Sequence, residues 1–118
     1  MANQSELLML RDRLRAFAAA RDWDQFHSPK NLSMALMVEV AELMEHFQWL
    51  SEAQSGNLAP EKQVVVAEEL ADILLYLVRL ADKLGVDLTE AALGKIEKNA
   101  VKYPAAQVRG SAKKYTEY

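Results

Sequence analysis

Apolar residues recur every three or four positions along most of this chain, which is the pattern of helices that bury one face. Gly and Pro are scarce, at 4 and 3 residues, so few helices are interrupted. The pattern predicts helices over residues 6–21, 29–50, 60–84 and 88–102. Because short connections join them, we expect an all-α fold, a four-helix antiparallel bundle.

The predicted helix ends carry residues that start or stop a helix for known physical reasons. Ser5 and Ser28 stand at N-cap positions, and Ser28 is followed by proline at the first helical position. Gly85 can adopt the left-handed conformation that ends a helix. Asp87, with a glutamate three residues later, predicts a capping box for the last helix.

The length of 118 residues predicts one domain, which we place at residues 1–104. Residues 105–118 are small, polar and basic, and we expect a tail that substrate or a neighbouring subunit orders. The chain has no cysteine, which excludes disulfides, thiolate zinc sites and a cysteine nucleophile. A net charge of −3 argues against nucleic acid as a partner.

No apolar run approaches the roughly 20 residues that a membrane-spanning helix needs. The first residues also lack a basic stretch followed by an apolar segment, so no secretory signal is visible. We therefore expect a cytoplasmic protein with no membrane partner.

Acidic residues interrupt the apolar stripes of the two central predicted helices. The stripes contain Leu32, Leu36, Leu43, Phe47 and Leu50 in one helix and Val65, Ile73, Tyr76, Leu77, Leu80 and Leu84 in the other. Glu39 falls inside the first stripe and Glu42 at its edge, while Glu69 and Asp72 fall inside the second. Each pair is three residues apart, so its side chains are neighbours on one helix surface.

Carboxylates are rarely buried unless they are paired or bind a metal, and no Lys or Arg falls in these stripes. If the stripes pack together, four carboxylates converge, and their oxygens are natural ligands for a hard divalent cation. Mg²⁺ is the expected ion, with Mn²⁺ as the alternative. The competing interpretation is that these acids are solvated at the stripe edge or meet basic residues from another helix.

Two further observations bear on the chemistry of such a site. Glu45 and Glu68 adjoin the acidic pairs but rotate away from the stripes, as surface acids, supporting groups or a general base. A di-iron site in a helical bundle would need Glu-x-x-His, whereas Leu43 stands three residues before His46. Oxygen-only ligation favours hydrolysis or phosphoryl transfer over redox chemistry.

Glu39-Val-Ala-Glu42, followed by Glu68-Glu69-Leu-Ala-Asp72, resembles the E-x-x-E and E-x-x-D signature of the all-α nucleoside triphosphate pyrophosphohydrolases. This MazG-like superfamily includes dimeric dUTPases and phosphoribosyl-ATP pyrophosphohydrolase. Further segments, at residues 21–32, 42–49, 72–77, 102–104 and 113–117, are similar to its dCTP pyrophosphatase branch. The resemblance covers about residues 5–117.

The resemblance implies hydrolysis of a nucleoside triphosphate, dCTP or a modified dCTP first, to the monophosphate and pyrophosphate, which cleanses the nucleotide pool. It implies that Glu39, Glu42, Glu69 and Asp72 bind magnesium. The expected catalytic carboxylates are Glu39, Glu42 and Glu45, with Glu42 or Glu45 as the general base. Two alternatives stay open, namely a related enzyme of different or broad specificity for dUTP, dTTP or oxidised nucleotides, and a non-catalytic helical interaction module.

The resemblance also implies substrate contacts. Trp23, His27, Trp49 and Tyr76 are expected to line the base and sugar pocket, although Tyr76 at helical spacing would ordinarily be a core residue. Lys95, Asn99, Lys102 and Tyr103 are expected at the substrate, although a solvated basic face would explain the lysines equally. Lys113, Lys114 and Tyr115 are expected to close over the site. Family members assemble as dimers or tetramers, so a homo-oligomer is expected.

Overall fold

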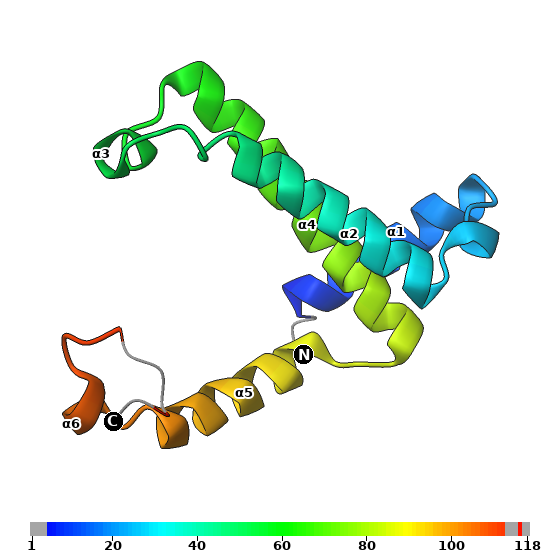
Figure 1. Ribbon diagram of the computed structural model, residues 1–118. Coiled ribbons are helices and arrows are strands. Elements are labelled where there is room, and N and C mark those ends of the chain that lie inside the picture. The colour runs from blue at the N-terminus through cyan, green and yellow to red at the C-terminus, as the bar shows by residue number, and fades with distance from the viewer. Residues whose placement is uncertain (1–4, 113–115, 117–118) are drawn as a thin grey trace. The chain divides into compact units, whose positions relative to one another are not determined.

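The structure is a computed structural model that describes residues 5–112 and 116. Within these residues the chain forms helices and no strands, so the predicted all-α class is confirmed (Figure 1). In chain order the helices are α1 (Glu6–Ala20), the 3-10 helix η1 (Asp24–Phe26), α2 (Pro29–Glu45), α3 (Glu52–Ser55), α4 (Pro60–Leu84), α5 (Leu88–Lys102) and α6 (Ala105–Val108). No helix among the described residues combines the length and apolar character needed to cross a membrane.

The chain divides into two compact units, residues 1–86 and 87–118, and each is described by itself. In the first unit, α2 and α4 lie side by side and run in opposite directions, and α1 packs against α4 (Figure 1). The second unit contains α5, the fourth predicted helix, together with α6 in the predicted tail region. The antiparallel packing of a fourth helix and the domain boundary at residue 104 therefore stay predictions.

Most of the predicted helix ends form as expected. The Ser28 hydroxyl accepts a hydrogen bond from the Asn31 amide at 3.1 Å, with proline at the first helical position. Gly85 ends α4 at φ 68°, a left-handed conformation that costs glycine little. The Asp87 carboxylate accepts from the Glu90 amide at 3.0 Å, but among the described residues no return bond from the Glu90 side chain completes the predicted capping box. Ser5 occupies the N-cap of α1, but its side chain makes no capping hydrogen bond among the described residues.

The second helix is shorter than predicted, since α2 ends at Glu45 instead of residue 50. The last turn has the tighter 3-10 hydrogen bond, because the His46 amide donates to the Leu43 carbonyl, three residues back. Ser51 then starts α3 with a reciprocal capping box in which Gln54 is the partner. An N-cap residue is extended (φ −72°, ψ 166° at Ser51), so the helix that precedes it has to end first.

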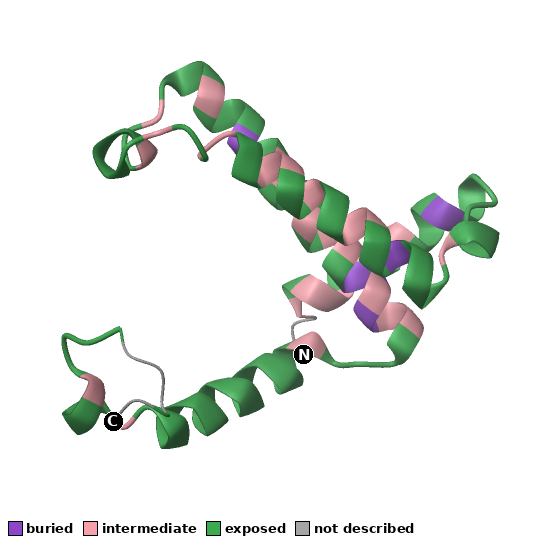
Figure 2. Cartoon of the chain, viewed as in Figure 1, coloured by how far each residue is buried: buried purple, intermediate pink, exposed green. Residues whose placement is uncertain are grey.

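The core of the first unit is small, and α1, α2 and α4 all contribute to it. Its buried apolar side chains are Ala18, Leu32, Val66, Val78 and Ala81 (Figure 2). The predicted stripe of α4 was partly wrong, because Val65 is 40% exposed whereas Val66 is buried. Neighbouring residues point about 100° apart on a helix, so Val66 lies on a different side of α4 from Val65.

Candidate active site

Three carboxylates from α2 and α4 meet between the two helices. Glu39 comes from α2, and Glu69 and Asp72 come from adjacent turns of α4. One carboxylate oxygen of each lies within 4.8 Å of the others. Glu39 and Glu69 are half-buried and Asp72 is exposed. Glu39 is at least 30 positions from the other two residues in the sequence. The sequence pattern placed it on a separate helix stripe, and the antiparallel packing of α2 on α4 brings the three together.

The cluster lacks the donors that would normally neutralise it. One oxygen of Glu39 and one of Glu69 are buried without a hydrogen-bond partner among the described residues. Burial, the charge of Glu42 and contact with the Glu69 carboxyl raise the pKa of Glu39 to about 7. A carboxyl–carboxyl contact becomes a hydrogen bond only when one partner is protonated. The ionised cluster is thus electrostatically unsatisfied.

This donor set fits a hard divalent cation. All the ligand atoms are carboxylate oxygens, which suit Mg²⁺ or Mn²⁺ rather than softer metals. The two unpartnered oxygens are the atoms that a cation would satisfy. Glu42 is half-buried one turn beyond Glu39 and acts on it through charge, but lies outside the group of three oxygens. Glu45, the third predicted catalytic carboxylate, is exposed at the last residue of α2.

A cavity of about 470 Å³ begins at Asp72 and extends between α1, η1 and α4. It is lined by Leu10, Arg13, Leu14, Phe17, Ala18, Trp23, His27, Asp72, Leu75, Tyr76 and Arg79. Three predicted pocket residues therefore share one cavity, namely Trp23, His27 and Tyr76. The Trp23 ring packs edge-on against two other rings. Its centroid lies 5.8 Å from that of Phe17 and 6.4 Å from that of His27. Its mostly apolar walls and one acidic end suit a ligand that is flat at one end and binds metal at the other.

The loop that carries Trp23 and His27 is held by local hydrogen bonds. The Trp23 amide donates to the Ala18 carbonyl at 2.9 Å, which folds the loop back onto α1. The Asn31 side chain donates to the Phe26 carbonyl at 3.0 Å, which ties the loop to α2. The aromatic residues are thus positioned by the ends of two helices.

Trp49, a further predicted substrate residue of the first unit, does not line this cavity. Trp49 is 86% exposed and lies beyond the end of α2, because that helix stops at Glu45. The other four, Lys95, Asn99, Lys102 and Tyr103, are exposed residues of the second unit. Their contacts with substrate stay predictions. Lys113, Lys114 and Tyr115 lie outside the described residues.

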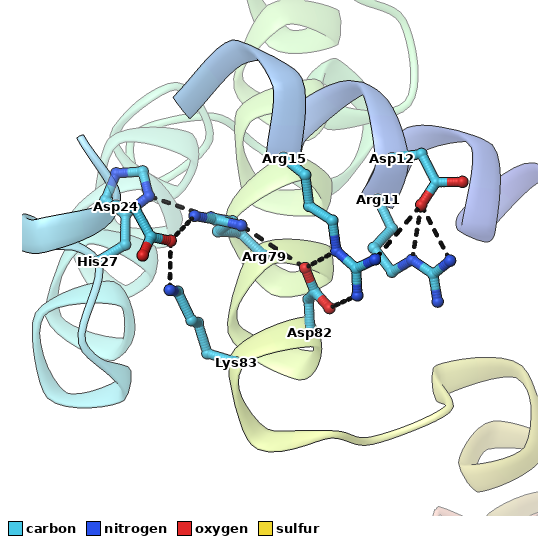
Figure 3. A network of polar contacts seen from close by, with 8 residues as sticks. All are labelled: Arg11, Asp12, Arg15, Asp24, His27, Arg79, Asp82 and Lys83. Carbon is cyan, nitrogen blue, oxygen red and sulfur yellow. Dashed lines mark hydrogen bonds and ion pairs between the residues drawn. The ribbon is translucent and has the colours of Figure 1, made fainter. Parts of the chain in front are cut away.

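A polar network at the other end of the cavity was not predicted. Arg79 is only 5% exposed and donates to Asp24 at 2.6 Å and to the His27 ring at 3.1 Å (Figure 3). On its far side it faces Asp82 at 3.6 Å, and Arg15 of α1 binds the same carboxylate at 2.8 Å. No basic residue was expected in the apolar stripe of α4 to pair with its acids; Arg79 is buried on this helix, but its carboxylate partners are Asp24 and Asp82.

The network stabilises its acids in their charged form. A hydrogen bond from Lys83, together with Arg79, holds the pKa of Asp24 below its usual value. The Arg15 guanidinium does the same for Asp82. The sequence did contain a signal for Arg79, because it lies three residues after Tyr76 and seven after Asp72, on the same helix face.

The chain is similar to known proteins in sequence and in fold. The model of the MazG-like family matches residues 34–118. The dCTP pyrophosphatase 1 proteins of Rattus norvegicus and Homo sapiens are 51% and 49% identical to the chain over 103 residues, or 86% of its length. The chain spans 61% of the length of these curated relatives.

Among solved structures, a pyrophosphatase from Archaeoglobus fulgidus superposes with a TM-score of 0.81 and 39% sequence identity. The match covers 88% of this chain and 97% of the archaeal chain. The family match runs through α2 and α4, which carry the three clustered carboxylates. The acidic helix pair, the all-α fold and these matches together show that the chain belongs to the MazG-like family.

Proposed function

We propose that the chain is a magnesium-dependent nucleoside triphosphate pyrophosphohydrolase that converts dCTP, or a modified dCTP, to the monophosphate and pyrophosphate. The observation that carries the proposal is the double position of Asp72. This residue belongs both to the carboxylate cluster and to the wall of the aromatic cavity. A base in the cavity would therefore have its phosphates beside the carboxylates. The names of the relatives, dCTP pyrophosphatase 1, support the choice of dCTP.

The aromatic cavity is the proposed base and sugar site. Its volume of about 470 Å³ falls within the range of small-molecule pockets. Trp23 and Tyr76 offer rings on which a base can stack, and each such contact contributes about 1–3 kcal/mol. His27 offers a polar ring at the same wall. Trp49 is proposed to contact substrate outside this cavity.

The carboxylate cluster is the proposed metal site, held by Glu39, Glu69 and Asp72 together with Glu42. A divalent ion held there would neutralise charge on the phosphates and lower the pKa of a water molecule. Glu42 or Glu45 is proposed to accept the proton of the attacking water. Glu42 is the closer to the cluster, since its charge acts directly on Glu39. Mn²⁺ is the proposed substitute ion.

The second unit and a neighbouring copy complete the proposal. Lys95, Asn99, Lys102 and Tyr103 are proposed to contact the triphosphate, with the chain from residue 105 onward closing over it. A homo-oligomer, a dimer or a tetramer, is proposed because apolar side chains are exposed along α2 and α4. The proposed role is to cleanse the cytoplasmic nucleotide pool.

The test is release of pyrophosphate from dCTP, 5-methyl-dCTP, dUTP, dTTP and an oxidised dGTP in parallel, with and without Mg²⁺. We expect turnover that depends on Mg²⁺, with the highest kcat/KM for dCTP or its methylated form. Highest activity on another nucleotide would reassign the base specificity within the same reaction. No turnover of any triphosphate, with no stabilisation by Mg²⁺ plus dCTP, would favour a non-catalytic module.

A further inference from the structure

The hydrogen bond between Arg79 and His27 has only one chemically allowed direction. The Arg79 Nε lies 3.1 Å from the His27 Nδ1. Arginine carries donors only, so Nδ1 has to be the acceptor and has to hold a lone pair. A neutral imidazole whose Nδ1 is unprotonated carries its proton on Nε2. The bond therefore specifies both the charge and the tautomer of His27.

Arg79 is held in place by carboxylates on both sides. Asp24, in η1, accepts from one terminal nitrogen at 2.6 Å, and Asp82, one turn along α4, faces the other at 3.6 Å. Lys83 binds Asp24 as well, and Arg15 binds Asp82 (Figure 3). A buried guanidinium with two carboxylate partners has little freedom to turn its Nε–H away from the ring.

The alternatives for His27 are each unfavourable. Rotating the ring by half a turn would place a carbon-bound hydrogen against the Arg79 donor. Protonating Nδ1 would place two N–H groups and two positive charges against each other. In agreement, burial and the charge of Arg79 lower the pKa of His27 below its usual value. His27 thus stays neutral with its proton on Nε2.

The Nε2–H group of His27 is available for a ligand. Among the described residues it makes no hydrogen bond, and His27 lines the same cavity as Trp23, Tyr76 and Asp72. A neutral histidine in this tautomer can only donate from Nε2 and cannot accept there. The wall of the cavity therefore carries one donor of fixed direction.

We propose that Arg79 is a positioning residue that holds His27 as an Nε2–H donor, so that the cavity selects a nucleobase presenting a hydrogen-bond acceptor toward His27. The acceptor is a carbonyl oxygen or a ring nitrogen with a free lone pair, and cytosine carries both on one edge. The selection of the base rests on the proposed function, whereas the state of His27 does not.

The first experiment determines the tautomer of His27 by long-range ¹H–¹⁵N NMR of protein labelled on histidine. The chain has only two histidines, so His46→Gln leaves the His27 signals alone in the spectrum. We expect an unprotonated Nδ1 and a protonated Nε2 at pH 7. A proton on Nδ1, or a cationic ring, would overturn the proposal whether or not the protein is an enzyme.

The second experiment replaces Arg79 by Met, which keeps the length of the side chain but removes the donor. Asp24 keeps Lys83 as a partner and Asp82 keeps Arg15, so the fold should survive. We expect a mixture of both neutral tautomers in Arg79→Met and the wild-type state in Arg79→Lys, which restores a cationic donor. The control, Arg11→Met, changes an arginine that pairs with Asp12 and should leave His27 unaltered. An unaltered tautomer in Arg79→Met would contradict the proposal.

The third experiment is a double-mutant cycle on dCTP hydrolysis. Arg79→Met and His27→Ala should each raise KM about three- to tenfold, the range expected for one hydrogen bond, with a smaller change in kcat. Adding Arg79→Met to His27→Ala should have no further effect, because Arg79 acts through His27. If the KM of the double variant rose by the product of the two single-variant increases, the two residues would act independently and the base-selecting role would be rejected. KM values within twofold of wild type in the single variants would reject it too. Absence of turnover in the wild type would reject the proposed function, and the NMR result would then stand by itself.

Discussion

Glu39 and Glu69 place two carboxylate oxygens where no donor reaches them among the described residues. Desolvation and the neighbouring charges both oppose ionisation, which is why Glu39 retains its proton to a higher pH than an exposed glutamate. A neutral residue in place of Glu39 would give a more stable metal-free fold. The arrangement is instead suited to binding a cation, and stability without the cation is reduced as a result.

Replacing Glu39 by Gln should therefore have opposite effects on stability and on function. Without metal at pH 8, we expect Glu39→Gln to raise Tm by several degrees, because it removes one charge from the cluster. Turnover of dCTP should fall at least about 100-fold, since a metal ion contributes several kcal/mol to such a transition state. Thermal melts with EDTA and with Mg²⁺, beside a pyrophosphate assay, check both effects. Wild-type activity in the variant would remove Glu39 from the site.

The pH dependence of stability follows from the same residue. The pKa of Glu39 rises from an unfolded value of 4.5 to about 7 in the fold, so the folded protein binds more protons between these values. Metal-free protein should therefore lose stability as pH rises from 4.5 to 7. Melts in EDTA across this range measure the loss, and the slope should be smaller in Glu39→Gln. Parallel profiles for both proteins would show that Glu39 titrates normally.

Among the elements, the segment from Trp23 to the first turn of α2 links local capping to the cavity. The Ser28 hydroxyl closes the first turn of α2, and Asn31 in that turn holds the Phe26 carbonyl. The N-terminus of α2 thus fixes the loop that carries two cavity residues, Trp23 and His27. Capping and pocket geometry are coupled through one short stretch of chain.

Removing this cap should cost stability and loosen the pocket. We expect Ser28→Ala to lower the free energy of unfolding by about 1 kcal/mol. Urea denaturation measures the loss, and KM for dCTP should rise while kcat changes little. Ser33→Ala is the matched control on the same helix, because within the described part of the chain the Ser33 hydroxyl bonds to the Lys30 carbonyl inside the helix and caps no helix end. An equal loss in both variants would mean that capping is not the cause.

The helix pair α2 and α4 also shows what sequence patterns can and cannot predict at this scale. Helix starts at Pro29 and Pro60 and the stop at Gly85 were predicted, because these signals act within a few residues. The end of α2 was missed because the apolar spacing continues through Phe47 and Leu50. In the structure, Ser51 and Gln54 form a capping box that starts a new helix, so α2 does not continue through these apolar residues.

For the whole molecule, the exposed apolar surface is the feature that a single chain does not explain. Met34, Met37, Val38 and Met44 are at least 57% exposed, and helical spacing places the three methionines on the α2 face opposite Glu39. On α4, the exposed large apolar residues are Val64, Val65, Leu70, Leu74, Leu77 and Leu84. Exposed apolar side chains in such numbers are typical of a protein that buries them in a subunit interface.

A charge on this surface should disrupt assembly. We expect the wild-type protein to be a dimer or tetramer by light scattering and Met37→Glu to shift it to smaller species, because the new carboxylate would be buried without a partner. Met37 is 65% exposed, so the change should leave the fold of the single chain intact by circular dichroism. Lys30→Glu, near the start of the same helix, is the control. A monomeric wild-type protein would contradict the proposed assembly.

The sequence by itself determined the helices and the acids that belong together. Periodicity and capping act over a few residues, so they placed Glu69 and Asp72 on one face of α4, and Glu39 with Glu42 on one face of α2. Resemblance to a known family then supplied Trp23, His27 and Tyr76, which the structure places in one cavity.

Only the tertiary structure decided which groups meet. It brought Glu39, Glu69 and Asp72 within 4.8 Å while leaving Glu42 beside them and Trp49 exposed. It also joined Arg79 to Asp24 and His27, more than 50 residues away in the chain. The physical reason is that helical spacing sets the direction of a side chain on its own helix. The distance between side chains on different helices depends on how those helices pack, which local sequence patterns do not encode.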